Sequence, residues 1–166
     1  MELKKISLQS VPAALRLVER YRLLNEPRVA ESICLDILAV DIDNNTARIE
    51  LILALTDQLG MEGTGPGLGR RALDLSVALA DAYQRVYYTG IIHERDAKAR
   101  LGRGYPGATF DAYELLCKAM DHFEEAEALA PQGVDDAVLR WNSCARIITD
   151  YRLEARPEDR EISLLE

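Results

Sequence analysis

The chain has 166 residues and a net charge of −8 at pH 7, and its length suits one domain of ordinary size. Nucleic acids and anionic membranes both attract basic surfaces, so this acidic balance disfavours either as a partner. Apolar residues make up 48% of the chain but aromatic residues only 6%, a mix that favours close helix packing over a β-sheet. We therefore expect one soluble, all-helical domain.

The three cysteines, Cys34, Cys117 and Cys144, fall within helical patterns, and none forms a C-x-x-C pair. Reduced thiols in the core are the natural interpretation. Residues 1–10 have no long apolar stretch or small-residue cleavage site, and apolar runs such as residues 51–55 are far too short to span a membrane. These features together favour the reducing cytoplasm as the compartment.

The first half of the chain is patterned as three helices after a lead-in of residues 1–10. Ser10 is the expected N-cap of the first helix, with Pro12 in the first turn, where proline is tolerated. Residues 25–27 break the pattern, and residues 41–44 form a turn rich in capping residues. These three helices are expected over residues 11–24, 28–40 and 46–59.

Residues 60–69 hold five glycines and cannot be helix interior. Four further helices are expected over residues 70–82, about 83–101, 109–130 and 135–151. The fourth and fifth are either nearly continuous or joined by a tight turn at residues 81–83. Residues 102–107 and 131–133 form the next breaks. The charged tail, residues 152–166, is expected to fray, although Ile162, Leu164 and Leu165 could dock.

The sixth helical segment carries the sharpest pattern, with Ala119, Phe123, Ala126 and Pro131 at spacings of four, three and five. This resembles the second helix of a tetratricopeptide repeat, in which small residues permit close helix approach, an aromatic fills the gap and proline ends the helix. The resemblance implies an all-α, antiparallel helix-pair array, a TPR-like α-α superhelix of about seven helices. Its TPR-like domain would cover residues 11–151.

Two other segments resemble parts of the same repeat. Ala30, Cys34 and Ile37 have the spacing of the second helix, and Gly90 and His93 match a large-x-x-Gly-x-x-aromatic stretch of the first helix, with His93 in the tyrosine position. The resemblance implies three degenerate repeats followed by a capping helix. The two glycine-rich breaks and the poorly matching second repeat depart from the family pattern.

Such domains mostly bind peptides or partner proteins on a concave face lined by first helices. The lysine-and-asparagine clamp of some members, which binds a C-terminal carboxylate, is not matched, since Leu15 and Glu19 occupy the relevant positions. By this resemblance the partner groove would comprise Arg16, Glu19, Arg22, Tyr87, Ile91, Glu94, Arg95, Val138, Asn142 and Arg146.

Catalytic, metal and cofactor sites are not expected. His93 lacks a second histidine four residues on, so the zinc-protease helix motif is absent. His122 is on another helix and is expected on or near the surface, and a metal site would need both histidines to converge with carboxylates. A Cys–His catalytic pair has no local signature, and the cysteines look like interior residues rather than exposed thiolates.

The glycine-rich breaks at residues 60–69 and 102–107 offer a second interpretation. A flexible loop before a helix N-terminus can bind phosphate through its backbone N–H groups, but this spacing matches neither the P-loop nor the dinucleotide fingerprint. In an up-down array the loops within repeats fall on one edge. Arginines near that edge would form a basic loop rim that contacts an acidic partner segment or an anionic ligand: Arg22, Arg28, Arg70, Arg71, Arg100 and Arg103.

The leading expectation is therefore a non-catalytic protein–protein interaction module, a scaffold or adaptor that binds a protein or peptide and needs no cofactor. The alternative is a small-molecule or anion-binding protein, or an enzyme, that uses the two glycine-rich loops. Self-association into a homo-oligomer is a third possibility.

Overall fold

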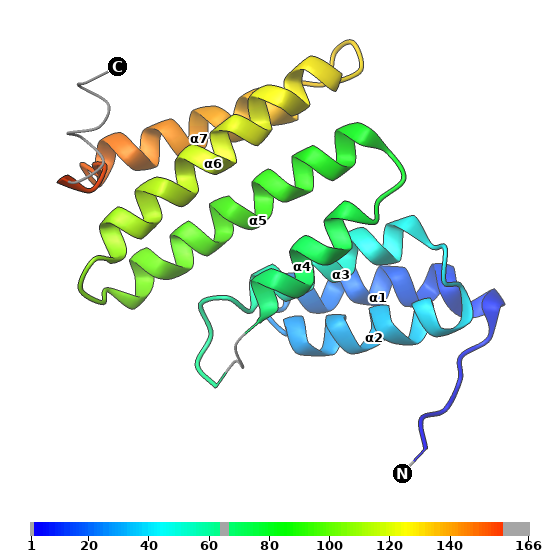
Figure 1. Ribbon diagram of the computed structural model, residues 1–166. Helices are drawn as coiled ribbons and strands as arrows, with labels where there is room; N and C mark the ends of the chain where they lie inside the picture. Colours follow the sequence, from blue (N-terminus) through cyan, green and yellow to red (C-terminus); the bar gives the residue numbers. More distant parts are fainter. Residues whose placement is uncertain (1, 64–66, 158–166) are drawn as a thin grey trace. The chain divides into compact units, whose positions relative to one another are not determined.

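The computed structural model describes residues 2–63 and 67–157. Within them the chain forms seven α-helices and a short 3-10 helix, with no strand, as the sequence predicts (Figure 1). The helices fall into two compact units, Met1–Asp81 and Ala82–Glu166. None of the described helices combines the length and the apolar character needed to cross a membrane.

The first unit begins with a 3-10 helix and continues as four α-helices, each packed on the next. Helix α1 also contacts α3 directly, so α1, α2 and α3 all pack against one another. The side chains of Val18, Ile37, Ile52 and Leu55 are fully buried and form the core of this unit. The elements are η1 (Leu8–Ser10), α1 (Val11–Leu23), α2 (Pro27–Val40), α3 (Asn45–Asp57) and α4 (Leu68–Val77).

The second unit has three helices, α5 (Ala82–Arg103), α6 (Ala108–Leu129) and α7 (Asp136–Asp150). Helix α6 packs against both α5 and α7 (Figure 1). Its Ala119, Phe123 and Ala126 are fully buried, so the pattern that stands out in the sequence forms the centre of this packing. Apolar burial on this scale is the main source of stability for a helical unit.

Gly90 of α5 permits a close approach between α5 and α6. A Cβ atom added at this position would lie 2.6 Å from Cε1 of Phe123 and 2.9 Å from Cδ1. Real Cβ atoms essentially never come so close to an aromatic carbon, so only glycine fits against this ring. The ring of Tyr87, one turn earlier on α5, also contacts Phe123, with centroids 5.9 Å apart.

The helix ends follow local capping rules at some positions and not at others. Asn44 caps α3, since its side-chain oxygen accepts a hydrogen bond of 2.8 Å from the backbone N–H of Ala47. Ser10 occupies the N-cap position of α1, as predicted, but its side chain makes no capping hydrogen bond to the helix. Its hydroxyl instead donates to the carbonyl oxygen of Ser7, 2.7 Å away, because the residues just before α1 coil into the 3-10 helix.

The sequence leaves open whether the fourth and fifth helices are continuous, and the structure separates them at residues 78–81. This break lies earlier than the tight turn proposed at residues 81–83. Ala78, Leu79, Ala80 and Asp81 include neither glycine nor proline, so composition does not mark the break. Leu79 is buried, and the guanidinium of Arg48 donates 3.3 Å to the carbonyl oxygen of Ala78, where α4 ends. Tertiary contacts therefore end this helix.

The first residues of the charged tail are packed rather than frayed. Leu153 is buried, and Arg156 forms ion pairs with Asp111 and with Glu114, the latter at 2.8 Å. The expectation of a frayed tail is therefore wrong for residues 152–157. Ile162, Leu164 and Leu165, which the sequence analysis suggested could dock, lie outside the described residues.

Candidate functional site

A cleft of about 380 Å³ opens between α1 and α3 of the first unit. Two of its lining residues, Glu19 and Arg22, belong to the partner groove expected from the sequence. Leu23 and Asn25 complete the side formed by α1 and the turn after it, while α3 contributes Glu50 and Asp57. Sequence reasoning missed the contribution of α3. Glu50 and Asp57 are seven residues apart, a spacing that places both on one helix face.

Arg22 is held in place at the floor of this cleft by two carboxylates. Its Nε donates 2.8 Å to Asp57 and its Nη1 donates 3.0 Å to Glu50, and the side chain is only 18% exposed. Burial alone would lower the pKa of Arg22, but the hydrogen bonds and charges of Asp57 and Glu50 raise it overall. The guanidinium is therefore a fixed cation whose charge is matched within the protein.

The other side chains at the cleft remain exposed to solvent. Leu23 is 82% exposed, and Glu19, one helical turn earlier, is also exposed. Asn25 has a backbone φ of +59°, in the left-handed region that asparagine tolerates better than most residues. The cleft thus combines a fixed guanidinium, an accessible carboxylate, an amide and a large apolar side chain.

Two of the four groove residues expected from α5 are buried. Ile91 and Glu94 are buried, so the prediction that they face a partner is wrong at these two positions. The half-buried Tyr87 stacks on Tyr83 with centroids 5.4 Å apart and packs edge-on against Tyr88. Arg95 is half-buried.

The other expected groove residues differ in exposure. On α7, Val138 and Asn142 are half-buried and Arg146 is exposed. On α1, Arg16 is exposed but does not line the cleft.

Glu94 is 0% exposed and is the most deeply buried charged residue of the described chain. Its carboxylate accepts hydrogen bonds from Nζ of Lys98 at 2.5 Å and from Nη1 of Arg140 at 3.4 Å. Burial would lower the pKa of Arg140, but the charges of Glu94 and Tyr87 raise it overall. A buried carboxylate needs such partners, and these come from α5 itself and from α7. Glu94 therefore links α5 to α7 through its ion pair with Arg140.

A second, more apolar pocket of about 330 Å³ lies beside Lys98 in the second unit. Leu101 and Gly102 of α5 line it, together with Ile147 and Tyr151 of α7. Lys98 is its only charged lining residue, and that ammonium group is already paired with Glu94. This pocket lacks a set of converging polar groups that would orient a ligand.

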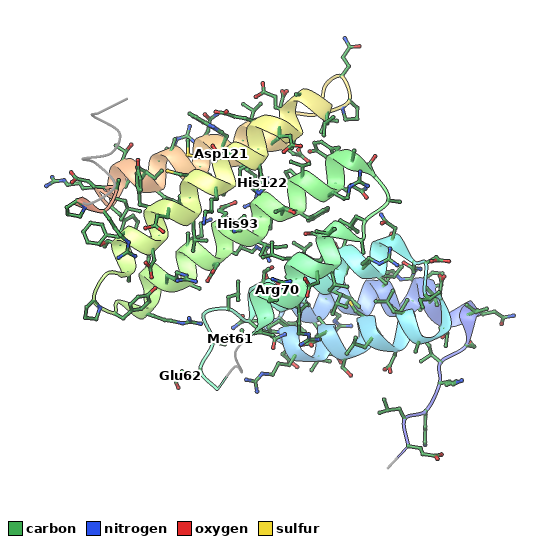
Figure 2. The ribbon with its side chains drawn as sticks, viewed as in Figure 1. Met61, Glu62, Arg70, His93, Asp121 and His122 are labelled. Carbon is green, nitrogen blue, oxygen red and sulfur yellow. The ribbon has the colours of Figure 1, made fainter. Side chains whose placement is uncertain are left out.

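The three arginines of the expected basic loop rim that lie near the first glycine-rich loop already have partners within the protein. Arg28 donates 3.0 Å to the carbonyl oxygen of Gly63, Arg70 pairs with Asp74 at 3.0 Å, and Arg71 pairs with Glu31 at 2.8 Å. Figure 2 shows Met61, Glu62 and Arg70 around the described part of the first glycine-rich loop. Arg71 is therefore neutralised by a carboxylate of α2, whereas Arg28 keeps its positive charge because its partners are neutral loop carbonyl oxygens.

The second glycine-rich loop is bordered by a compact charge network. Arg100 donates 3.2 Å to Asp96 and 3.2 Å to Asp111, and the hydroxyl of Tyr105 donates 2.5 Å to the same Asp111. This hydroxyl and the nearby arginines hold the pKa of Asp111 below its usual range. Arg103 lies exposed in the last turn of α5. The network closes the turn between α5 and α6.

The two histidines meet where α5 packs on α6 (Figure 2). The rings of His93 and His122 are stacked, with centroids 5.5 Å apart and planes within 5° of each other. His93 lies at this helix interface, and His122, expected on or near the surface, is half-buried there. Burial lowers the pKa of His93, and the charges of His122 and Lys118 lower it further, while Asp96 acts in the opposite direction. In the described residues no group of three or more histidine, cysteine or acidic side chains could hold a metal ion.

The cysteines are free thiols, with Cys34 and Cys144 buried and Cys117 half-buried. Burial and nearby carboxylates raise the pKa of Cys34 and of Cys144 to about 12. Thiolate is the reactive form, so these two residues are poor nucleophiles in the folded chain.

Comparison of the chain with protein-family models, curated proteins and solved structures finds no match.

Proposed function

We propose that the chain is a non-catalytic protein–protein interaction module, a scaffold or adaptor that binds its partner at the cleft between α1 and α3. The observation that carries this proposal is the cleft itself, which exposes a large apolar side chain, Leu23, beside accessible polar groups. An apolar side chain surrounded by polar groups has the composition of a small docking surface.

The helix arrangement adds support. In a tetratricopeptide-like array the concave face is lined by first helices, and α1 and α3 would be the first helices of two successive pairs. Their direct contact agrees with this assignment. So does the Gly90–Phe123 approach, because it joins residues that the resemblance places on the first and second helices of one repeat.

The alternative, anion binding at the glycine-rich loops, has weaker support. Arg71 and Arg100 already pair with carboxylates, and Arg28 donates to loop carbonyl oxygens. An anion would have to displace these internal partners before it could use the same guanidinium groups. We also propose a cytoplasmic location, which the three free thiols favour.

The proposal can be tested by quantitative affinity capture with a surface variant and a matched control. Leu23→Asp places a charge at the cleft, and Leu139→Asp places the same charge on α7, where Leu139 is 65% exposed. Because an apolar anchor carries much of the binding energy of an interface, we expect Leu23→Asp to reduce capture of a specific partner at least about tenfold. Mass spectrometry of proteins captured from the native host gives the measurement.

The control should retain the same proteins as the unmodified chain. Equal retention by Leu23→Asp and Leu139→Asp would show that the cleft is not the docking site. Retention of a second copy of the chain as the main partner would identify self-association as the function of the same surface.

A further inference from the structure

The α1–α3 cleft is lined by more negative than positive charge, which favours basic partners over acidic ones. Three carboxylates and one guanidinium line it, so the lining residues carry two net negative charges. Glu50 and Asp57 both pair with Arg22, and these contacts satisfy the one cation. An acidic peptide would therefore meet excess negative charge and a guanidinium that is already engaged.

Glu19 is the carboxylate left for a partner. It lies exposed on α1, and its carboxylate forms no ion pair or hydrogen bond with another residue that the structure describes. It is one helical turn before Leu23, and side chains four residues apart on a helix are neighbours. A cation and an apolar group placed side by side on a partner would thus meet Glu19 and Leu23 together.

The size of the cleft limits what can enter it. A volume of about 380 Å³ lies near the lower end of the range for small binding sites, and it suits one or two side chains rather than a folded domain. The long methylene stem of lysine or arginine can follow an apolar wall while its charged end reaches a carboxylate.

We propose that the cleft binds a peptide segment of a partner protein that carries lysine or arginine next to an apolar residue. Glu19 pairs with the cation, Leu23 covers the apolar neighbour, and Arg22 fixes Glu50 and Asp57 as the negative far wall. This inference rests on the proposed function, because it names the chemistry of the segment that occupies the same cleft.

Selection from a random library of displayed 12-residue peptides on the immobilised 166-residue chain tests this inference. Enriched peptides are then synthesised with a fluorescent label, and their affinity is measured by anisotropy. The variant is Glu19→Lys, and the control is Glu125→Lys, which makes the same charge change at an exposed position of α6.

We expect enrichment of lysine or arginine beside an apolar residue. Reversing the charge of Glu19 should weaken binding of these peptides at least about tenfold, whereas Glu125→Lys should change it less than about twofold. Raising the salt concentration should weaken binding, since partly exposed charge pairs are screened.

Two results distinguish the failure of this inference from the failure of the proposed function. The charge preference would be overturned if the enriched peptides lacked basic residues, or if their affinity were unchanged by Glu19→Lys but abolished by Leu23→Asp. Either result would still support the cleft as the docking site. Enriched peptides that bind both cleft variants as tightly as the unmodified chain, or the absence of any enriched peptide, would overturn both.

Discussion

In the first unit one guanidinium, that of Arg22, lies between two carboxylates, whereas in the second unit one carboxylate, that of Glu94, lies between two cations. The central group is 18% exposed in the first case and 0% in the second. The first arrangement lines an open cleft, and the second joins α5 to α7 inside the fold. Similar charge triads can therefore line a solvent-exposed cleft or link helices around a buried group, and the energetic weight of each depends on how much water reaches it.

The largest effect should come from the tight packing of the second unit. Gly90→Ala would force a methyl group into the Phe123 ring, so we expect a loss of about 3 kcal/mol in the free energy of unfolding, despite the better helix propensity of alanine. Chemical denaturation followed by circular dichroism provides the measurement.

Gly102→Ala is the matched control for this substitution, since it lies on the same helix and its added Cβ would meet nothing within 4 Å. It should leave stability unchanged or raise it slightly. A Gly90→Ala chain as stable as the Gly102→Ala chain would show that the packing of the second unit yields easily to an added methyl group.

A smaller loss is expected from Glu94→Gln. The variant keeps the size of the side chain but leaves Lys98 and Arg140 without a buried negative charge, which should cost about 2 kcal/mol. Both cations are partly exposed and can turn to water, which limits the cost. Glu125→Gln, an exposed control on α6, should change the unfolding free energy by less than about 0.5 kcal/mol in the same denaturation experiment.

Arg22→Met should cost only about 1 kcal/mol, because Glu50 and Asp57 remain partly hydrated when their cation is removed. The same denaturation measurement compares it directly with Glu94→Gln. If Arg22→Met proved the more damaging of the two, the first triad rather than the second would be the one that holds its unit together.

The smallest effect should be the pH dependence of the stacked histidines. The pKa of His93 is lowered in the folded chain, so the unfolded chain binds its proton first as the pH falls. This contribution to stability is therefore present above about pH 6.5, the ordinary histidine value, and is lost as the pH falls from there towards the folded pKa.

Denaturation at pH 7.5 and pH 5.5 tests this effect by comparing the unmodified chain with His93→Gln, since the many carboxylates titrate in both. We expect the unmodified chain to lose slightly more stability on acidification. An identical change in the two chains would mean that titration of His93 does not influence how stability changes between these two pH values.

Sequence reasoning predicted most of this architecture because helical periodicity and turn residues are local signals. The Ala119–Phe123–Ala126 pattern identified a buried helix face, and residues 25–27 and 102–107 marked turns where composition changes sharply. The sequence did not predict the break at residues 78–81, because none of these residues is a helix breaker. The features that accompany the end of α4 are a hydrogen bond from Arg48 of α3 and the burial of Leu79.

The candidate site was only partly predictable for the same reason. Glu19 and Arg22 were found by their place on a first helix, but Glu50 and Asp57 were missed because their role depends on the distance between α1 and α3. The burial of Glu94 had a local signal. It lies between Ile91 and Ala97 at helical spacing and four residues before Lys98, which marks a charged residue on an apolar face.

The two fully enclosed thiols, Cys34 in the first unit and Cys144 in the second, give the protein a built-in reporter for each unit. A thiol reagent can modify either residue only when its surroundings open, so the two labelling rates give the free energy of local opening of each unit in one sample. Replacing the half-buried Cys117 with serine would leave only these two signals. Their ratio would show whether the unit with the open cleft is also the one that opens first.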